Sequence, residues 1–147
     1  MKSEYETALP ATLFDLPTPC AVIDLHRLIR NTERMISRTH DLGVRLRPHV
    51  KTHKCVEAAR YQVGNHFGGI AVSTLAEAEH FAAGQFSDIT YAVPIAPGRV
   101  AHAVSLAQRL NRLNLLVDDP AVIHMLSAQS ILKGVTINVL VKVDCGY

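Results

Sequence analysis

From residue 44 onward, short apolar runs alternate with longer stretches in which apolar residues recur every three or four positions. Short apolar runs are typical of buried strands, and the longer spacing is typical of amphipathic helices. Regular alternation of the two predicts parallel βαβ units and therefore an α/β protein. The predicted strands span residues 44–51, 69–73, 88–93, 113–117 and 136–143, and the predicted helices span residues 53–64, 74–84, 97–110 and 119–129.

The residues before this alternation follow a less regular pattern. Residues 1–15 have no clear period and are predicted to form an N-terminal arm. A short strand is predicted at residues 20–23, after two prolines. Asp24 is a suitable N-cap for a following helix, which is expected to end near Gly43.

The segment 44–51 differs from the other predicted strands because its two faces have opposite character. One face is apolar, and the other carries four basic side chains: Arg45, Arg47, His49 and Lys51. Both faces of a parallel strand are normally buried and apolar. The basic face is therefore typical either of a solvated edge strand or of a site for a ligand that prefers cations, and the pattern alone leaves both interpretations open.

Lys51 is the main candidate for chemistry in this segment. It lies at the predicted carboxyl end of the strand, where α/β folds place their functional groups. An amine surrounded by other cations loses proton affinity. Condensation with an aldehyde requires a neutral lysine amine, so the pattern is compatible with an aldehyde-binding lysine.

Composition and charge exclude several classes of protein. The chain is 48% hydrophobic and 19% charged, which is typical of a globular protein. Its formal net charge of +2 does not favour nucleic-acid binding. No apolar run approaches the ~20 residues that span a bilayer, and residues 1–12 do not resemble a secretory signal. Three dispersed cysteines favour reduced thiols and a cytoplasmic location: Cys20, Cys55 and Cys145.

Nucleotide and metal motifs are weak in this chain. It has neither a G-x-G-x-x-G run nor a Walker loop, which argues against a nucleotide-binding sheet but still leaves a doubly wound sheet or an incomplete barrel open. His49, His53 and Cys55 are metal-ligand types, but no fourth ligand has a useful spacing. We therefore expect no metal at this cluster.

Residues 47–54 read Arg-Pro-His-Val-Lys-Thr-His-Lys, which resembles the signature of the D-threonine aldolase and D-serine dehydratase family of pyridoxal-phosphate enzymes. These enzymes share the alanine-racemase barrel. Segments 16–24, 70–79 and 139–147 resemble further parts of the same family in the same order. The resemblance implies a partial (β/α)8 barrel of the TIM type, with five barrel strands and an N-terminal strand and helix.

The family resemblance also implies a cofactor and its ligands. Lys51 is expected to carry pyridoxal 5'-phosphate, with His49 and Arg47 as further cofactor-binding candidates. Relatives also bind a divalent metal through ligands in a β-rich domain, which would lie outside this chain. A complete barrel takes about 250 residues. Residues 16–147 are therefore expected to be an incomplete N-terminal barrel domain, inactive by itself.

Two functions follow from this resemblance. The first is a lyase that acts on small D-3-hydroxy amino acids, of the D-threonine aldolase or D-serine dehydratase type. The alternative is a non-catalytic pyridoxal-phosphate carrier, or an amino-acid racemase, with the same barrel. Neither function requires nucleic acid or a membrane, and a homodimer of the complete protein is left open. The residues that decide the reaction type are expected to lie beyond Tyr147.

Overall fold

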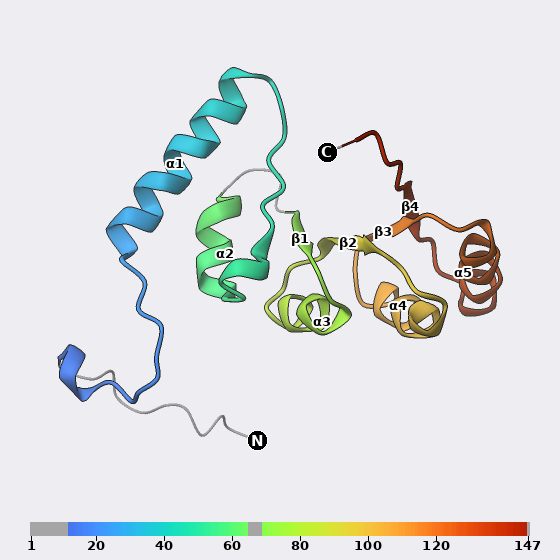
Figure 1. Ribbon diagram of the computed structural model, residues 1–147, viewed down its shortest axis with the longest axis horizontal. Coiled ribbons are helices and arrows are strands. Elements are labelled where there is room, and N and C mark those ends of the chain that lie inside the picture. The colour runs from blue at the N-terminus through green and yellow to red at the C-terminus, as the bar shows by residue number, and fades with distance from the viewer. Residues whose placement is uncertain (1–11, 65–68, 147) are drawn as a thin grey trace.

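The computed structural model describes residues 12–64 and 69–146. Its centre is a parallel sheet of four strands in the order β1 (Ile70–Val72), β2 (Asp88–Pro94), β3 (Arg112–Val117) and β4 (Asn138–Val141). Helices α3 (Leu75–Ala83), α4 (Val100–Ala107) and α5 (Pro120–Lys133) connect successive strands and lie on the same side of the sheet (Figure 1). Sequential strand order with all connecting helices on one side is the arrangement of a βα barrel, whereas a doubly wound sheet has helices on both faces. The predicted α/β class and partial barrel are confirmed.

Capping residues explain where these helices begin. The Thr74 side chain accepts a hydrogen bond from the Glu77 backbone N–H at 3.0 Å, which starts α3. Asp119 caps α5 in the same way, and Pro120 occupies its first turn. Helix α5 continues beyond the predicted end at residue 129 and stops at Gly134, whose φ of +63° favours glycine.

The core lies between the sheet and these helices. Side chains at alternate positions of each strand point to opposite faces, which explains why β3 alternates buried and less buried residues. We call the face turned away from α3, α4 and α5 the inner face. The helix-facing positions are almost fully buried and apolar: Ile70, Val72, Ile89, Tyr91, Leu113, Leu115 and Val117.

Two predicted strands are wrong. Residues 44–51 do not form a strand; they make one isolated parallel bridge, His49 with Ala71, and then turn into the 3-10 helix η2 (Val50–Thr52). Pro48 has no N–H to donate to a ladder, which limits pairing there. Residues 20–23 also lack strand structure, because no strand lies beside them in the described part of the chain and their side chains are exposed. The described sheet therefore has four strands rather than the five that were predicted.

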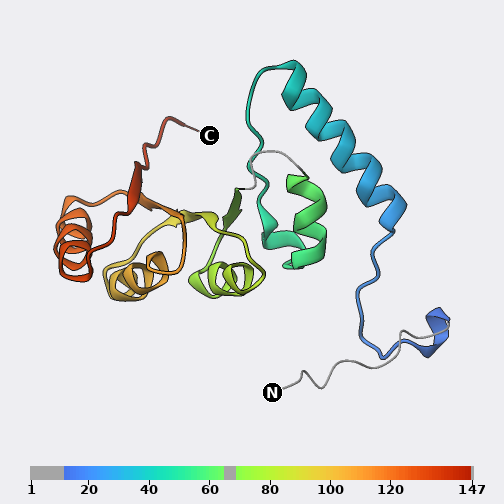
Figure 2. The same cartoon turned by 180° about the vertical axis from the view of Figure 1, so that it is seen from behind.

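The N-terminal elements lie beside the sheet. Asp24 caps α1 (Leu25–Asp41) as predicted, and its carboxylate accepts from the Arg27 N–H at 3.0 Å. Helix α2 (Val56–Val63) lies between α1 and the sheet (Figures 1 and 2). A short 3-10 helix, η1 (Leu13–Asp15), falls inside the predicted arm, most of which lies outside the described residues. No helix in residues 12–64 or 69–146 is long and apolar enough to cross a membrane.

Candidate functional site

The bridge between His49 and Ala71 places Lys51 at the carboxyl edge of the sheet. The bridge is parallel, so the residues that follow on both segments emerge at the same edge: Lys51 from η2 and Ser73 from the end of β1. The Lys51 side chain is exposed. Within the described residues its amine has no carboxylate within ion-pair distance. Lys51 is therefore accessible where barrel folds bind their ligands.

His49 is hydrogen-bonded on both ring nitrogens. Nδ1 accepts from the Lys51 backbone N–H at 3.3 Å, so the proton of a neutral ring lies on Nε2, which is 3.4 Å from Ser73 Oγ. Burial and the positive charge of Lys51 lower the pKa of His49 below its ordinary value, and the charge of Glu77 opposes this shift. The neutral imidazole is favoured at this edge.

Lys54, the second lysine of the motif, has different surroundings. Its Nζ lies 3.2 Å from Glu77 Oε1. Glu77 is nearly buried, and its other carboxylate oxygen accepts from the Ser73 backbone N–H at 2.8 Å. Burial acts to raise the pKa of Glu77, but the Ser73 hydrogen bond and the Lys54 amine outweigh it and leave that pKa below its ordinary value. Glu77 is a charged partner for Lys54 across the neutral pH range.

The zinc interpretation of His53 and Cys55 finds no support in the geometry. His53 Nε2 is 2.9 Å from Gln62 Oε1, and His53 Nδ1 accepts from the Cys55 backbone N–H at 3.0 Å. Both ring nitrogens therefore bind groups of the chain itself. In the part of the chain that the structure describes, no group of three or more His, Cys, Asp or Glu side chains is placed to hold a metal ion.

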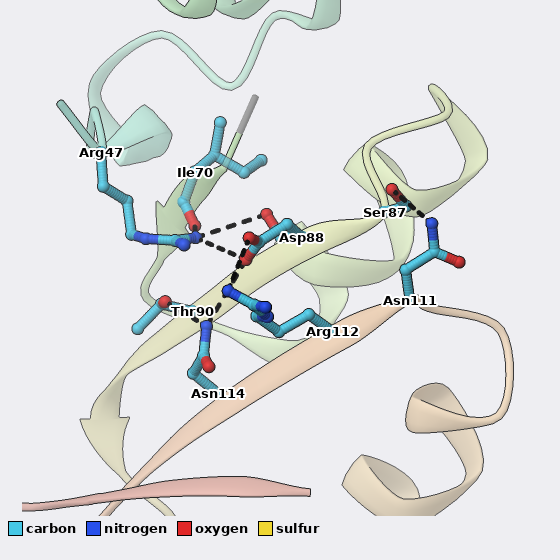
Figure 3. A network of polar contacts seen from close by, with 8 residues as sticks. All are labelled: Arg47, Ile70, Ser87, Asp88, Thr90, Asn111, Arg112 and Asn114. Carbon is cyan, nitrogen blue, oxygen red and sulfur yellow. Dashed lines mark hydrogen bonds and ion pairs between the residues drawn. The ribbon is translucent and has the colours of Figure 1, made fainter. Parts of the chain in front are cut away.

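Arg47 lies at the opposite, amino edge of the sheet. Its guanidinium pairs with the Asp88 carboxylate at 2.8 Å and donates to the Ile70 carbonyl at 3.2 Å, where β1 and β2 begin. Arg112 lies 3.8 Å from the same carboxylate, and Figure 3 shows the three charged side chains converging on the inner face. The predicted contact of Arg47 with the cofactor stays a prediction; the ion pair and hydrogen bond given above join its side chain to the starts of β1 and β2.

Asn114 extends this network along β3. Its amide donates to Thr90 Oγ1 at 3.0 Å and lies 3.5 Å from the Asp88 carboxylate (Figure 3). Gly69 leaves room for the Arg47 side chain, because a Cβ on this glycine would lie only 2.5 Å from the guanidinium. At the amino ends of the strands, the inner face therefore carries polar side chains that are joined to one another by hydrogen bonds and ion pairs.

Sequence reasoning missed most residues of these networks, among them Ser73, Glu77 and Asp88. Each makes contacts with residues more than 20 positions away, which a linear pattern does not reveal. One signal was present for Asp88, since it is a carboxylate at the start of an otherwise apolar strand. Glu77 follows Thr74 by three residues, a spacing typical of a capping box, and this local pattern does not indicate a tertiary partner.

A groove of about 690 Å³ lies between α1 and α2, away from these residues. Its lining comes from Ile29, Ile36, Tyr61 and neighbouring residues, and does not include Lys51 or Ser73. We therefore locate the candidate site at Lys51 and not at this groove.

Comparison with known proteins identifies the family. A model of the alanine racemase N-terminal domain matches residues 23–147 of this chain. The chain belongs to the alanine racemase N-terminal domain family. The match includes the whole sheet as well as Lys51, His49 and Glu77.

Two curated relatives of this domain family have related names. The chain is 46% identical to D-threo-3-hydroxyaspartate dehydratase of Delftia sp. (strain HT23), over 90% of this chain and 35% of the relative. It is 38% identical to D-serine dehydratase of Dictyostelium discoideum, over 90% of this chain and 36% of the relative. The chain thus spans about a third of the length of these relatives.

Solved structures agree with this domain assignment. A D-threonine aldolase from Filomicrobium marinum matches with a TM-score of 0.82 and 31% identity, over 91% of this chain and 36% of that one. A D-threo-3-hydroxyaspartate dehydratase, described as a cysteine-to-alanine mutant in the metal-free form, matches with a TM-score of 0.81 and 44% identity, over 91% of this chain and 35% of that one. The alanine racemase N-terminal domain fold is therefore supported by both sequence and structure.

Proposed function

We propose that this chain carries the cofactor lysine of a pyridoxal-phosphate-dependent lyase that acts on D-3-hydroxy amino acids. It would do so within a protein of the full length of its relatives. The observation that carries the proposal is the exposed amine of Lys51 at the carboxyl edge of a barrel-type parallel sheet. Barrel enzymes bind ligands and perform their chemistry at this edge.

The side chains around Lys51 fit an aldehyde cofactor that has polar substituents. Lysine amines condense with aldehydes, and Lys51 is accessible to one. Ser73 supplies a hydroxyl group and His49 a neutral imidazole at the same edge. When bound, pyridoxal phosphate supplies a ring that accepts electron density from the α-carbon of an amino acid. Because His49 is neutral, it adds no second positive charge beside the Lys51 amine.

The substrate class follows from the names of the relatives. D-serine, D-threonine and D-threo-3-hydroxyaspartate are all D-configured amino acids with a hydroxyl group on the carbon next to the α-carbon. Dehydratases and aldolases break different bonds of this same unit. These shared names favour a lyase over the alternatives of a non-catalytic carrier or a racemase.

A divalent metal is part of this proposal. The name of one similar structure refers to a metal-free form of a cysteine mutant, which implies that this relative also has a metal-bound form. We propose that the metal ligands lie outside these 147 residues. The metal would polarise the substrate hydroxyl group.

A cytoplasmic location and a homodimer are further proposals. Cys20, Cys55 and Cys145 are all free thiols, which supports a reducing compartment. The homodimer rests on the family resemblance alone.

Activity on paired enantiomers tests the proposed function. A protein that contains this chain and has the full length of its relatives is assayed with the D- and L-forms of threonine, serine and 3-hydroxyaspartate. The assay measures release of ammonia or an aldehyde. We expect activity on D-forms, its loss in a Lys51→Ala variant, and its loss on chelation with recovery when a divalent metal is added. Equal activity on L-forms would contradict the substrate class, and indifference to chelation would contradict the metal.

A further inference from the structure

Two lysines of one motif, three residues apart, have different surroundings. Both lysines are exposed, and the difference lies in their partners: the Lys51 amine has no ion-pair partner among the described residues. Lys54 pairs with Glu77 at 3.2 Å. Lys54 also has a φ of +50°, a left-handed conformation that non-glycine residues rarely adopt. Such a conformation persists where surrounding contacts hold it, and Glu77 is one of those contacts.

Glu77 is itself fixed in place. Its side chain is 9% exposed, and one carboxylate oxygen accepts from the Ser73 backbone N–H at 2.8 Å. Its own backbone N–H donates to the Thr74 hydroxyl in the first turn of α3. A carboxylate held by the backbone at the β1–α3 junction is a rigid anchor for a flexible lysine.

The residues that precede Lys51 are also held to β1 and the residue that follows it. Ser73 Oγ lies 3.4 Å from His49 Nε2, and the Ala71 N–H donates to the Pro48 carbonyl at 2.8 Å. Contacts to β1 and α3 therefore hold the chain on both sides of Lys51. Without Glu77, the side that includes Lys54 would lose its charged contact.

We propose that Glu77 is a positioning residue that makes Lys51, and not Lys54, the reactive amine of the motif. Its carboxylate holds the Lys54 ammonium and, through Ser73, ties the turn to the sheet. The identity of the ligand that uses Lys51 rests on the proposed function, but the difference in reactivity between the two lysines does not.

The test measures the reactivity of each lysine in protein without added cofactor. Glu77→Gln removes the negative charge and keeps an oxygen that accepts from the Ser73 N–H. Glu79→Gln is the matched control, because Glu79 lies on the same helix and pairs with His102 and Arg109 instead. An amine-acylating reagent is added at limiting time, and peptide mass spectrometry gives a rate for each lysine.

We expect Glu77→Gln to raise the acylation rate of Lys54 about three- to fivefold, with no change in Glu79→Gln. Reduction with borohydride after addition of pyridoxal phosphate should label Lys51 in the wild type, whereas in Glu77→Gln it should also label Lys54 and label Lys51 less than in the wild type. An unchanged Lys54 rate in a folded Glu77→Gln variant would overturn the proposal.

A second pair of variants keeps the test decisive if Glu77→Gln does not fold. Lys54→Arg retains a cation for Glu77, whereas Lys54→Gln does not. We expect Lys51 labelling to be normal in Lys54→Arg and reduced in Lys54→Gln, and equal labelling in the two would overturn the proposal. If pyridoxal phosphate labels no lysine in any variant, including the wild type, the proposed function fails, while the acylation rates still decide the role of Glu77.

Discussion

His49 and Lys51 lie two residues apart on one turn, and the charge of Lys51 acts directly on the His49 ring. Replacing Lys51 with glutamine removes a positive charge, so we expect the pKa of His49 to rise. Proton NMR titration of the His49 ring measures this shift. Lys133→Gln is the control, since Lys133 lies in the last turn of α5, on another element. A His49 pKa that responds equally to both substitutions would contradict the proposed coupling.

The lowered pKa of His49 also predicts how stability depends on pH. A histidine whose pKa is lower in the folded than in the unfolded chain binds fewer protons when folded. Its contribution to stability is therefore fully present above the unfolded value, near 6.5, and is lost as pH falls from there toward the folded pKa. Urea unfolding at a series of pH values should show this loss, and it should be smaller in Lys51→Gln. An equal or larger loss in that variant would count against the assignment.

At the residue scale, the sequence makes Lys51 the candidate cofactor lysine, which stays a prediction, but it does not reveal which distant residues contact the motif. The resemblance of residues 47–54 to a family motif singles out Lys51 as the candidate, because the residues of a short motif are neighbours along the chain. Glu77 and Asp88 were not predicted as partners, because their contacts with Lys54 and Arg47 depend on how β1, β2 and α3 assemble. Tertiary partners of this kind have no local pattern in the sequence.

At the element scale, the segment before η2 has one isolated bridge to β1 in place of a strand ladder. The Arg47–Asp88 ion pair is one of the side-chain contacts that also hold it to the sheet. A methyl group at Gly69 would lie within 2.5 Å of the Arg47 guanidinium, so Gly69→Ala should displace this side chain and break the pair. We expect a loss of about 1–3 kcal/mol in the free energy of unfolding, measured with urea.

Two controls separate this effect from a general effect of alanine. Gly98→Ala is the matched variant, because a Cβ there meets nothing within 4 Å, and it should be nearly neutral. In a variant that already carries Arg47→Met, Gly69→Ala should lower the free energy of unfolding only slightly, because the guanidinium that the added methyl group would displace is absent. If Gly69→Ala lowers the free energy of unfolding equally with and without Arg47, the effect of the substitution does not depend on the Arg47 side chain.

The helices were easier to predict than the strands. Local caps such as Thr74 and Asp119 determine where helices begin, and these signals are readable in the sequence. Strand 44–51 was predicted from its alternating polarity, but Pro48 and the turn at η2 leave it with one bridge. Alternation shows which side chains share a face; it does not show whether a neighbouring backbone is close enough to pair.

At the scale of the whole molecule, β4 and the residues after it expose apolar side chains. Val141 and Val143 are each 68% exposed, and in the described sheet β4 pairs with β3 alone. Exposed apolar edge strands promote association between chains. We therefore expect residues 1–147, expressed alone, to elute from size exclusion as species larger than a monomer.

A pair of lysine substitutions tests this expectation. Val141→Lys places a charge on the edge strand and should shift the elution toward the monomer. Leu42→Lys is the control, because Leu42 is 65% exposed at the end of α1, on a different element from the edge strand. Equal shifts for both variants would show that general hydrophobicity, and not the strand edge, drives association.

The central claim is that Lys51 is the lysine that holds the cofactor, and mapping of the bound cofactor tests it most directly. Protein of the relatives' length is incubated with pyridoxal phosphate, reduced with borohydride, digested and examined by peptide mass spectrometry. We predict a pyridoxyl group on Lys51, and no such group on that peptide in a Lys51→Arg variant. A pyridoxyl group found on Lys54 in the wild type, with Lys51 unmodified, would contradict the account.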